Sequence, residues 1–159
     1  MKSTPSPGSP ERQQLEEIWF PIEKDADGYP ESKSWEGLLG RTSQAGFVIE
    51  SVPFYLKNVA RGDVVAAEKT DRLRFSHVVQ RGGHNTYRLL MDTAPAHEIE
   101  KARRELQARG LMVEMNESGI LLAVDVPQCE AQDEVDRYLI ENKEAGRWEL
   151  QDGFINNPS

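Results

Sequence analysis

Few side chains in this sequence are of the kinds that carry out catalysis or hold a metal ion. Its histidines are His77, His84 and His97, and its single thiol is Cys129. Zinc sites take several ligands at short spacings along the chain, and these four residues do not stand at such spacings. We therefore expect neither a metal site nor a cofactor.

The three histidines are expected in different surroundings. His77 falls on the apolar face of a strand and is expected in the core, whereas His97 falls in the first turn of a helix and is expected to be exposed. His84 follows two glycines and precedes Asn85 in a short loop between two strand-like runs, a pattern typical of a hairpin. At the tip of a hairpin, His84 and Asn85 could contact a ligand or could serve only the turn.

No nucleophile stands in a setting that would activate it. Cys129 precedes a helix, which favours the thiolate, but the carboxylates of Glu130, Asp133 and Glu134 oppose it, so a passive cysteine is expected. The chain also lacks the glycine-rich patterns of nucleophile elbows and of phosphate-binding loops. We expect a protein that is not an enzyme, in which the tryptophans are core or groove aromatics.

Short stretches of alternating apolar and polar residues predict a β-rich lobe over residues 15–81. In the first stretch, Ile18, Phe20 and Ile22 stand at every second position, which is the period of a strand. Strands at intervals of about ten residues are typical of a small curled sheet or partial barrel. The expected elements are strands at Ile18–Ile22, Ser34–Arg41, Gly46–Phe54, Val64–Glu68 and Leu73–Gln80, with a turn at Asp25–Pro30.

Residues 82–159 follow a different pattern, in which strands and helices alternate. Pro95 suits the first turn of a helix and Gly110 suits the residue after its last turn. The expected elements are a strand at Tyr87–Met91, this helix, strands at Leu111–Met115 and Ile120–Val126, a helix at Ala131–Ala145 and a strand at Trp148–Phe154. The order β-α-β-β-α-β predicts a ferredoxin-like lobe, and the whole chain is expected to have an α+β fold.

The chain has 159 residues, which suits one domain of two lobes. Residues 1–14 are polar and rich in proline, so we expect a flexible tail and not a signal peptide. The hairpin expected at residues 81–85 would join the lobes 15–81 and 82–159 into one continuous folding unit that shares a sheet. No apolar stretch is long enough to cross a membrane, and a single thiol suits a reducing compartment, so we expect a cytoplasmic protein.

The net charge of −8 is concentrated at one end of the chain. Residues 1–110 contain equal numbers of acidic and basic side chains, so the whole excess falls in residues 111–159. An acidic protein of this kind is not expected to bind nucleic acid. The carboxylates around the last helix are either a solvated helix face or a surface that steers a basic protein partner. They are Glu130, Asp133, Glu134, Asp136, Glu141 and Glu144.

Several short motifs occur in an order that is similar to a known family. They are Trp19-Phe20-Pro21, Asp27-Gly28-Tyr29-Pro30, Trp35-Glu36, Val52-Pro53-Phe54, Gly62-Asp63-Val64-Val65, His84, and Ala145-Gly146-Arg147-Trp148-Glu149. Over Ile18 to Gly153 the chain resembles a small bacterial family called domain of unknown function 4265. This resemblance implies a stand-alone bacterial protein of the cytoplasm, and it brings no established reaction and no catalytic residues. Some small families of this sort serve as immunity proteins beside antibacterial toxins.

We expect the protein to bind another protein without catalysis. The preferred hypothesis is an immunity protein whose acidic lobe occludes the active site of a cognate toxin with a basic cleft. The alternative is a small enzyme or sensor domain that binds an anionic small molecule between the lobes. The ligand-binding residues expected for this alternative are His84, Asn85, Arg74 and Arg88.

Overall fold

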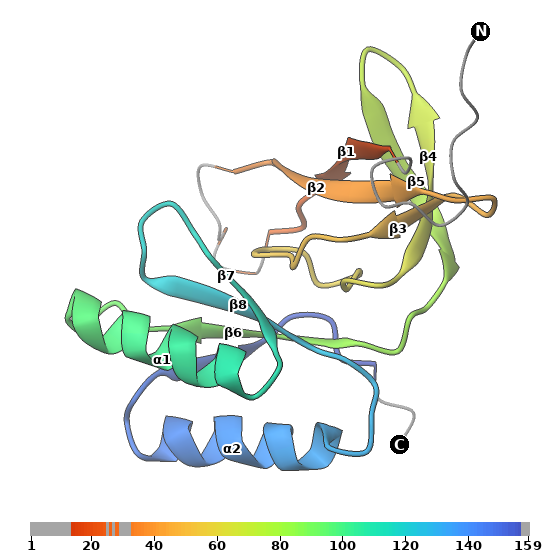
Figure 1. The fold of residues 1–159 in the computed structure, drawn as a ribbon. Helices are drawn as coiled ribbons and strands as arrows, with labels where there is room; N and C mark the ends of the chain where they lie inside the picture. The colour runs from red at the N-terminus through yellow and green to blue at the C-terminus, as the bar shows by residue number, and fades with distance from the viewer. Residues whose placement is uncertain (1–13, 25, 27, 29–32, 157–159) are drawn as a thin grey trace, which may run out of the picture.

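Alternating apolar residues build the first five strands into a closed barrel (Figure 1). The computed structural model describes residues 14–24, 26, 28 and 33–156. The strands of the barrel are β1 (Leu15–Pro21), β2 (Trp35–Thr42), β3 (Phe47–Ile49), β4 (Val64–Lys69) and β5 (Leu73–Gln80). The expected tail, apart from Gln14, and most of the expected turn at 25–30 lie outside the described residues.

The barrel closes because its last strand returns to its first. Successive strands pair in antiparallel fashion, and β5 then pairs with β1 in parallel, with Ile18 opposite Leu73. The interior is filled by apolar side chains, among them the expected Ile18, Phe20 and Ile22, and the ring of Phe20 stacks on that of Phe75 with centroids 4.6 Å apart. The predicted partial barrel is therefore a complete one.

The third expected strand is much shorter than the pattern suggested. The sequence predicted Gly46–Phe54, but β3 ends at Ile49, and residues 50–63 form a loop that leaves the barrel wall. Pro53 lacks the N–H group that a strand within a sheet needs. The loop is nevertheless apolar in part, because Val52, Leu56 and Val59 are buried.

His77 is exposed, and its predicted place in the core was wrong. The pairing of β4 with β5 skips one residue between Ala66 opposite His77 and Ala67 opposite Phe75. A bulge of this kind inserts one extra residue, so the side chains beyond it face the other way. Val78, in place of His77, therefore packs against the barrel core.

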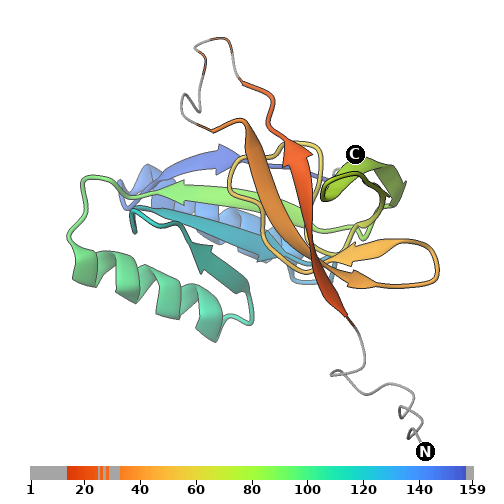
Figure 2. The same ribbon diagram turned by 90° about the horizontal axis from the view of Figure 1, so that it is seen from above.

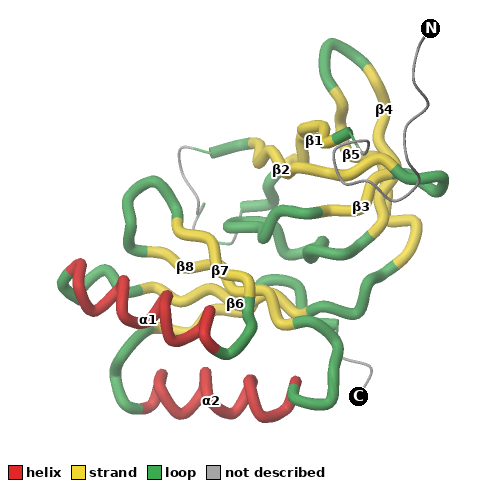
Figure 3. Tube along the Cα trace, viewed as in Figure 1, coloured by secondary structure: helices red, strands yellow, loops and turns green. Residues whose placement is uncertain are grey.

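The second lobe is a four-stranded sheet with two helices on one face (Figures 1 and 3). Its strands stand in the order β7-β8-β6-β9, and all neighbours are antiparallel. Apolar side chains of the helices and of the facing side of the sheet form a second core. The elements are β6 (Asn85–Leu90), α1 (Ala96–Ala108), β7 (Met112–Met115), β8 (Leu121–Val126), α2 (Gln132–Glu144) and β9 (Glu149–Asp152).

The barrel lies against the other face of this sheet, and in Figure 2 its strands β1 and β2 cross above it. Residues 81–84 connect the two lobes, and they are not the predicted hairpin, because β5 belongs to the barrel and β6 to the second sheet. The two lobes therefore do not share a sheet. The glycines here serve close packing instead: a Cβ on Gly82 would stand 2.5 Å from the carbonyl oxygen of Gly62.

No helix within the described part of the chain is long and apolar enough to cross a membrane.

Candidate functional site

Buried charged side chains hold the loop 50–63 between the two lobes. Glu36, on β2, accepts hydrogen bonds from the backbone N–H groups of Phe54 at 2.7 Å and Tyr55 at 3.0 Å. Burial raises the pKa of the Glu36 carboxyl, and these backbone bonds and the charge of Arg88 oppose the rise only in part. Glu114, on β7, accepts a further bond from the N–H group of Val52.

Arg88 belongs to this interface and not to an open ligand site. It lies on β6 and is buried, with 3% of its surface exposed. Its guanidinium donates to the carbonyl oxygens of Pro53 and Leu56 in the loop. A buried arginine bonded in this way holds the barrel loop on the sheet.

His84 and Asn85 are also engaged inside the molecule. The Nδ1 atom of His84 lies 2.9 Å from both carboxylate oxygens of Asp125, a buried residue of β8, and Arg61 approaches the same carboxylate at 3.5 Å. The His84 ring packs so close to Gly62 that a Cβ there would stand 2.7 Å from Nε2. Asn85 is buried, and its Oδ1 accepts a bond from the N–H group of Asn156.

Arg74 lies away from the other three predicted ligand residues. It stands on β5, where its strand neighbours are Glu68 and Trp19, whereas Arg88 pairs with positions on β8 and β9. Its guanidinium contacts Asp71 at 3.2 Å and lies 5.2 Å from the ring centre of Trp35. His84 and Asn85 are consecutive in the chain, and the structure does not bring Arg74 together with them and Arg88, because Arg74 lies in the barrel sheet and Arg88 in the second sheet.

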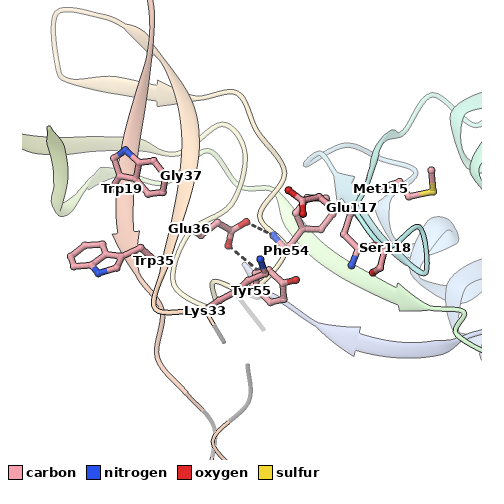
Figure 4. A pocket seen from close by; sticks show the side chains of 11 residues that line it. Trp19, Lys33, Trp35, Glu36, Gly37, Phe54, Tyr55, Met115, Glu117 and Ser118 are labelled. Carbon is pink, nitrogen blue, oxygen red and sulfur yellow. Dashed lines mark hydrogen bonds between the residues drawn. The ribbon is translucent and has the colours of Figure 1, made fainter. Parts of the chain in front are cut away.

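A pocket of about 560 Å³ does lie between the lobes, as Figure 4 shows. The barrel contributes Trp19 and Trp35, the loop 50–63 contributes Phe54 and Tyr55, and the turn from β7 to β8 forms the opposite wall. The size and the aromatic walls are typical of a binding site for an organic group. The remaining lining residues are Lys33, Glu36, Gly37, Met115, Asn116, Glu117 and Ser118.

Both walls of this pocket, which we call the interlobe pocket, are held in place by local interactions. The Arg72 guanidinium lies 4.2 Å from the ring centre of Trp19 and 5.7 Å from that of Trp35, a cation–π arrangement that favours these positions of the two indoles. On the opposite wall, the Oδ1 atom of Asn116 accepts three backbone N–H groups, those of residues 119, 120 and 121, at 3.1–3.2 Å. These bonds stabilise the conformation of the turn.

The sequence signalled the pocket only in part. Trp19 and Trp35 stand out of phase with the apolar positions of their strands, which places them on the outside of the barrel. Of the tryptophans, Trp35 is exposed and lines the pocket, while Trp148 is buried in the core of the second lobe. Nothing in the local pattern indicated that the turn at 116–119 would meet these indoles, because the two segments are far apart in the chain.

The acidic residues predicted to bind a partner divide into two groups. Asp136 is partly buried and accepts a hydrogen bond from the Tyr87 hydroxyl at 2.9 Å. Burial, with the nearby charges of Asp133 and Asp152, raises the pKa of the Asp136 carboxyl. The other five carboxylates are exposed on α2 or just before it: Glu130, Asp133, Glu134, Glu141 and Glu144.

Among the described residues, no group of three or more histidine, cysteine, aspartate or glutamate side chains could hold a metal ion. His97 is exposed, as predicted, with 78% of its side chain accessible. Cys129 is exposed and free.

Comparison with known proteins gives a fold relative and a family. No curated protein matches the chain. A solved structure described as "Novel crystal structure of a hypothetical protein from Neisseria gonorrhoeae" is similar in fold, with a TM-score of 0.66 and 22% sequence identity, over 89% of this chain and 96% of that one. The family profile named Domain of unknown function (DUF4265) matches residues 36–150, which is most of the chain. The chain therefore belongs to the family of proteins that carry the Domain of unknown function (DUF4265).

Proposed function

We propose that the protein is a cytoplasmic binding module that recognises a basic protein through the outer face of α2, without catalysing a reaction. The observation that supports this is the difference between its two helices. On α1, Glu100 pairs with Arg103 at 2.7 Å and Glu105 pairs with Arg147 at 2.9 Å. Within the described residues, no ion pair engages the five exposed carboxylates of α2 and the residues before it, so their charge is available to a partner.

The finer form of this proposal is an immunity protein that neutralises a cognate antibacterial toxin. Such a partner would present a basic cleft, and the carboxylates of α2 would occupy the place of an anionic substrate. Steering by charge would speed the encounter and make it sensitive to salt.

Co-expression with the product of the adjacent gene tests the proposal. The variant carries the reversals Asp133→Lys, Glu134→Lys and Glu141→Lys, and the matched control carries Glu23→Lys, Glu68→Lys and Asp92→Lys, which change the net charge equally at exposed sites elsewhere. We expect the wild type and the control to co-purify with the partner and to suppress its toxicity, and the α2 variant to do neither. Equal binding of the partner by the α2 variant and by the control variant would contradict the proposal that α2 is the binding surface.

An alternative proposal is a sensor domain that binds an anionic small molecule between the lobes. The interlobe pocket supports its location, and Lys33 is the cation that lines it. Arg88 and His84, in contrast, are occupied by contacts within the molecule. A thermal-shift screen with nucleotides and metabolic anions tests it: a large shift that Lys33→Gln abolishes would favour this alternative, because a ligand that binds only the folded state raises the melting temperature.

We also infer that the second lobe is of the ferredoxin-like class. The strand order β7-β8-β6-β9 supports the inference, and so do the places of the helices, because α1 follows β6 and α2 follows β8 in the chain.

A further inference from the structure

Exposed apolar side chains gather beside one edge of the second sheet. Seven large apolar residues are exposed among the described ones, and four of them line just two pockets. Trp35 and Met115 belong to the interlobe pocket, and Leu39 and Met112 line a second pocket of about 470 Å³. Apolar surface concentrated in this way on a polar molecule is typical of an interaction site.

The two pockets follow one another along the same pair of strands. Trp35 and Gly37, early in β2, face the end of β7 and its turn, whereas Leu39, later in β2, faces the start of β7. The start of the loop 50–63 lies between these two strands, because the carbonyl oxygen of Leu39 accepts the N–H group of Glu50 and the Glu114 carboxylate accepts that of Val52. The two pockets lie at different points along this seam between the lobes. We call the two pockets and the strip between them the β2–β7 groove.

One side of this groove is a strand edge. β7 pairs with β8 on one side and is the last strand of its sheet. An edge strand offers backbone N–H and C=O groups to another extended chain. The methionines beside it have flexible side chains that can adapt to different partners.

Carboxylates outnumber cations among the residues that line the two pockets, while Arg72 and Arg74 lie over the rings of the pocket tryptophans. The Glu17 carboxylate lies beside Gly37 of the interlobe pocket, since a Cβ on Gly37 would stand 2.6 Å from Oε2, and Glu117 stands on the turn. Neither has an ion-pair partner among the residues that the structure describes. Glu50 and Glu114 line the second pocket, where Glu50 pairs with Arg41 at 3.2 Å and Glu114 accepts the N–H group of Val52. Lys33 is the cation among the lining residues of the two pockets.

We propose that the β2–β7 groove binds an extended segment of a partner protein in which Lys or Arg side chains alternate with large apolar ones. The apolar side chains enter the two pockets, the basic ones reach Glu17 and Glu117, and the backbone lies along β7. This surface is on the barrel side of the second sheet, and α2 covers the opposite side (Figure 1). The groove is therefore separate from the surface assigned to α2 above, and the inference does not rest on that assignment.

The test uses the full chain and two sets of synthetic peptides of about nine residues, roughly 30 Å when extended. In one set Lys or Arg alternates with Leu, Ile or Phe, and in the matched set Glu replaces each basic residue. Binding is followed by the fluorescence of Trp19 and Trp35. Leu39→Lys places a positive charge in the groove, which opposes a basic peptide, and Val79→Lys is its control, because both side chains are 45% exposed on barrel strands.

We expect at least one basic peptide to bind the wild type and Val79→Lys equally, and Leu39→Lys at least tenfold more weakly, while the acidic set does not bind. Met115→Lys should weaken binding in the same way, with Ile140→Lys, exposed to a similar extent on α2, as its control. Unchanged melting temperatures show that the variants fold. No binding by the basic set at millimolar concentration, or equal binding to Leu39→Lys, overturns the proposal. A dimer that Leu39→Lys dissociates also overturns it, since a second copy of the chain would then fill the groove.

Discussion

Two buried charges of opposite sign, Glu36 and Arg88, hold the loop 50–63 between the lobes. Arg88 bonds to loop carbonyl groups, and its charge lies close enough to Glu36 to oppose the rise in the pKa of that carboxyl. Taking both charges out of water is costly, and each is tolerated because the other is present. Removing one of the two charges should therefore lower the stability of the protein more than removing both.

Arg88→Met tests this coupling directly. The substitution removes the counter-charge of Glu36 and the donors to two loop carbonyls, so we expect it to lower the free energy of unfolding by about 3–5 kcal/mol. Adding Glu36→Gln to this variant should recover part of the loss. Urea denaturation measures the stability of the single and the double variant. Arg104→Met, which removes an exposed ion pair with Glu100, is the control and should change stability far less. A loss at Arg88 no larger than that of the control contradicts the coupling.

The raised pKa of the Glu36 carboxyl predicts a specific dependence of stability on pH. Its pKa in the unfolded chain is the ordinary value of about 4.5, and in the folded protein it is higher because of burial. Between these two values the folded state binds more protons than the unfolded state, so stability falls as the pH rises through this range. We expect the wild type to gain stability relative to Glu36→Gln as the pH is lowered from 7 towards 4.5. Denaturant unfolding of both proteins across this range measures the difference, and a constant difference would rule the effect out.

At the scale of the elements, the sequence predicted which segments form strands and helices better than it predicted their ends and phases. The apolar run of β8 is buried at every position from Leu121 to Val126, as its composition suggested. The sequence did not reveal the bulge in the pairing of β5 or the loop after β3, because both depend on which distant segments of the chain lie beside these residues. A bulge changes which side chains face inward without changing local composition, so His77 carries no signal of its exposure.

The connection at residues 81–85 was misread for a similar physical reason. A pair of glycines before His84 suits a hairpin turn, but it also suits a segment that passes close to another backbone. Only the position of Gly62, some twenty residues earlier, distinguishes these two uses. The interlobe pocket could not be predicted either, because its walls come from segments that are far apart in the chain. The exposure of most of the α2 carboxylates could be predicted, since helical spacing alone separates them from the buried Val135 and Leu139.

Gly62→Ala separates the cost of backbone strain from the cost of crowding at the junction. Gly62 has a φ of +91° and a Cβ there would meet the ring of His84, whereas Gly110 has a φ of +85° and a Cβ there would meet nothing within 4 Å. Gly110→Ala should therefore cost about 1 kcal/mol of strain, and Gly62→Ala should cost more. Combining each substitution with His84→Ala in a double-mutant cycle should make the two costs equal. Thermal or urea unfolding measures them, and an excess at Gly62 that persists without the imidazole contradicts this explanation.

At the scale of the whole molecule, the loop 50–63 makes the two lobes depend on each other. Its backbone groups are satisfied by Glu36 from the barrel and by Arg88 and Glu114 from the second sheet. If either lobe unfolded alone, the remaining lobe would keep charged side chains and loop backbone groups without their partners. Leaving such groups unpaired is costly, and this favours unfolding of both lobes together.

We therefore expect a single cooperative transition, which two probes can follow separately. Both helices belong to the second lobe, so far-ultraviolet circular dichroism reports mainly on that lobe. Trp19 and Trp35 stand on barrel strands at the interlobe pocket, so in a Trp148→Phe background their fluorescence reports on the barrel and on its contact with the second lobe. Coincident urea midpoints for the two signals are the expected result, as two-state unfolding requires. Arg88→Met loosens the contact between the lobes, so in this variant the two midpoints should separate or both should fall. Separate midpoints already in the Trp148→Phe parent would show that each lobe folds on its own.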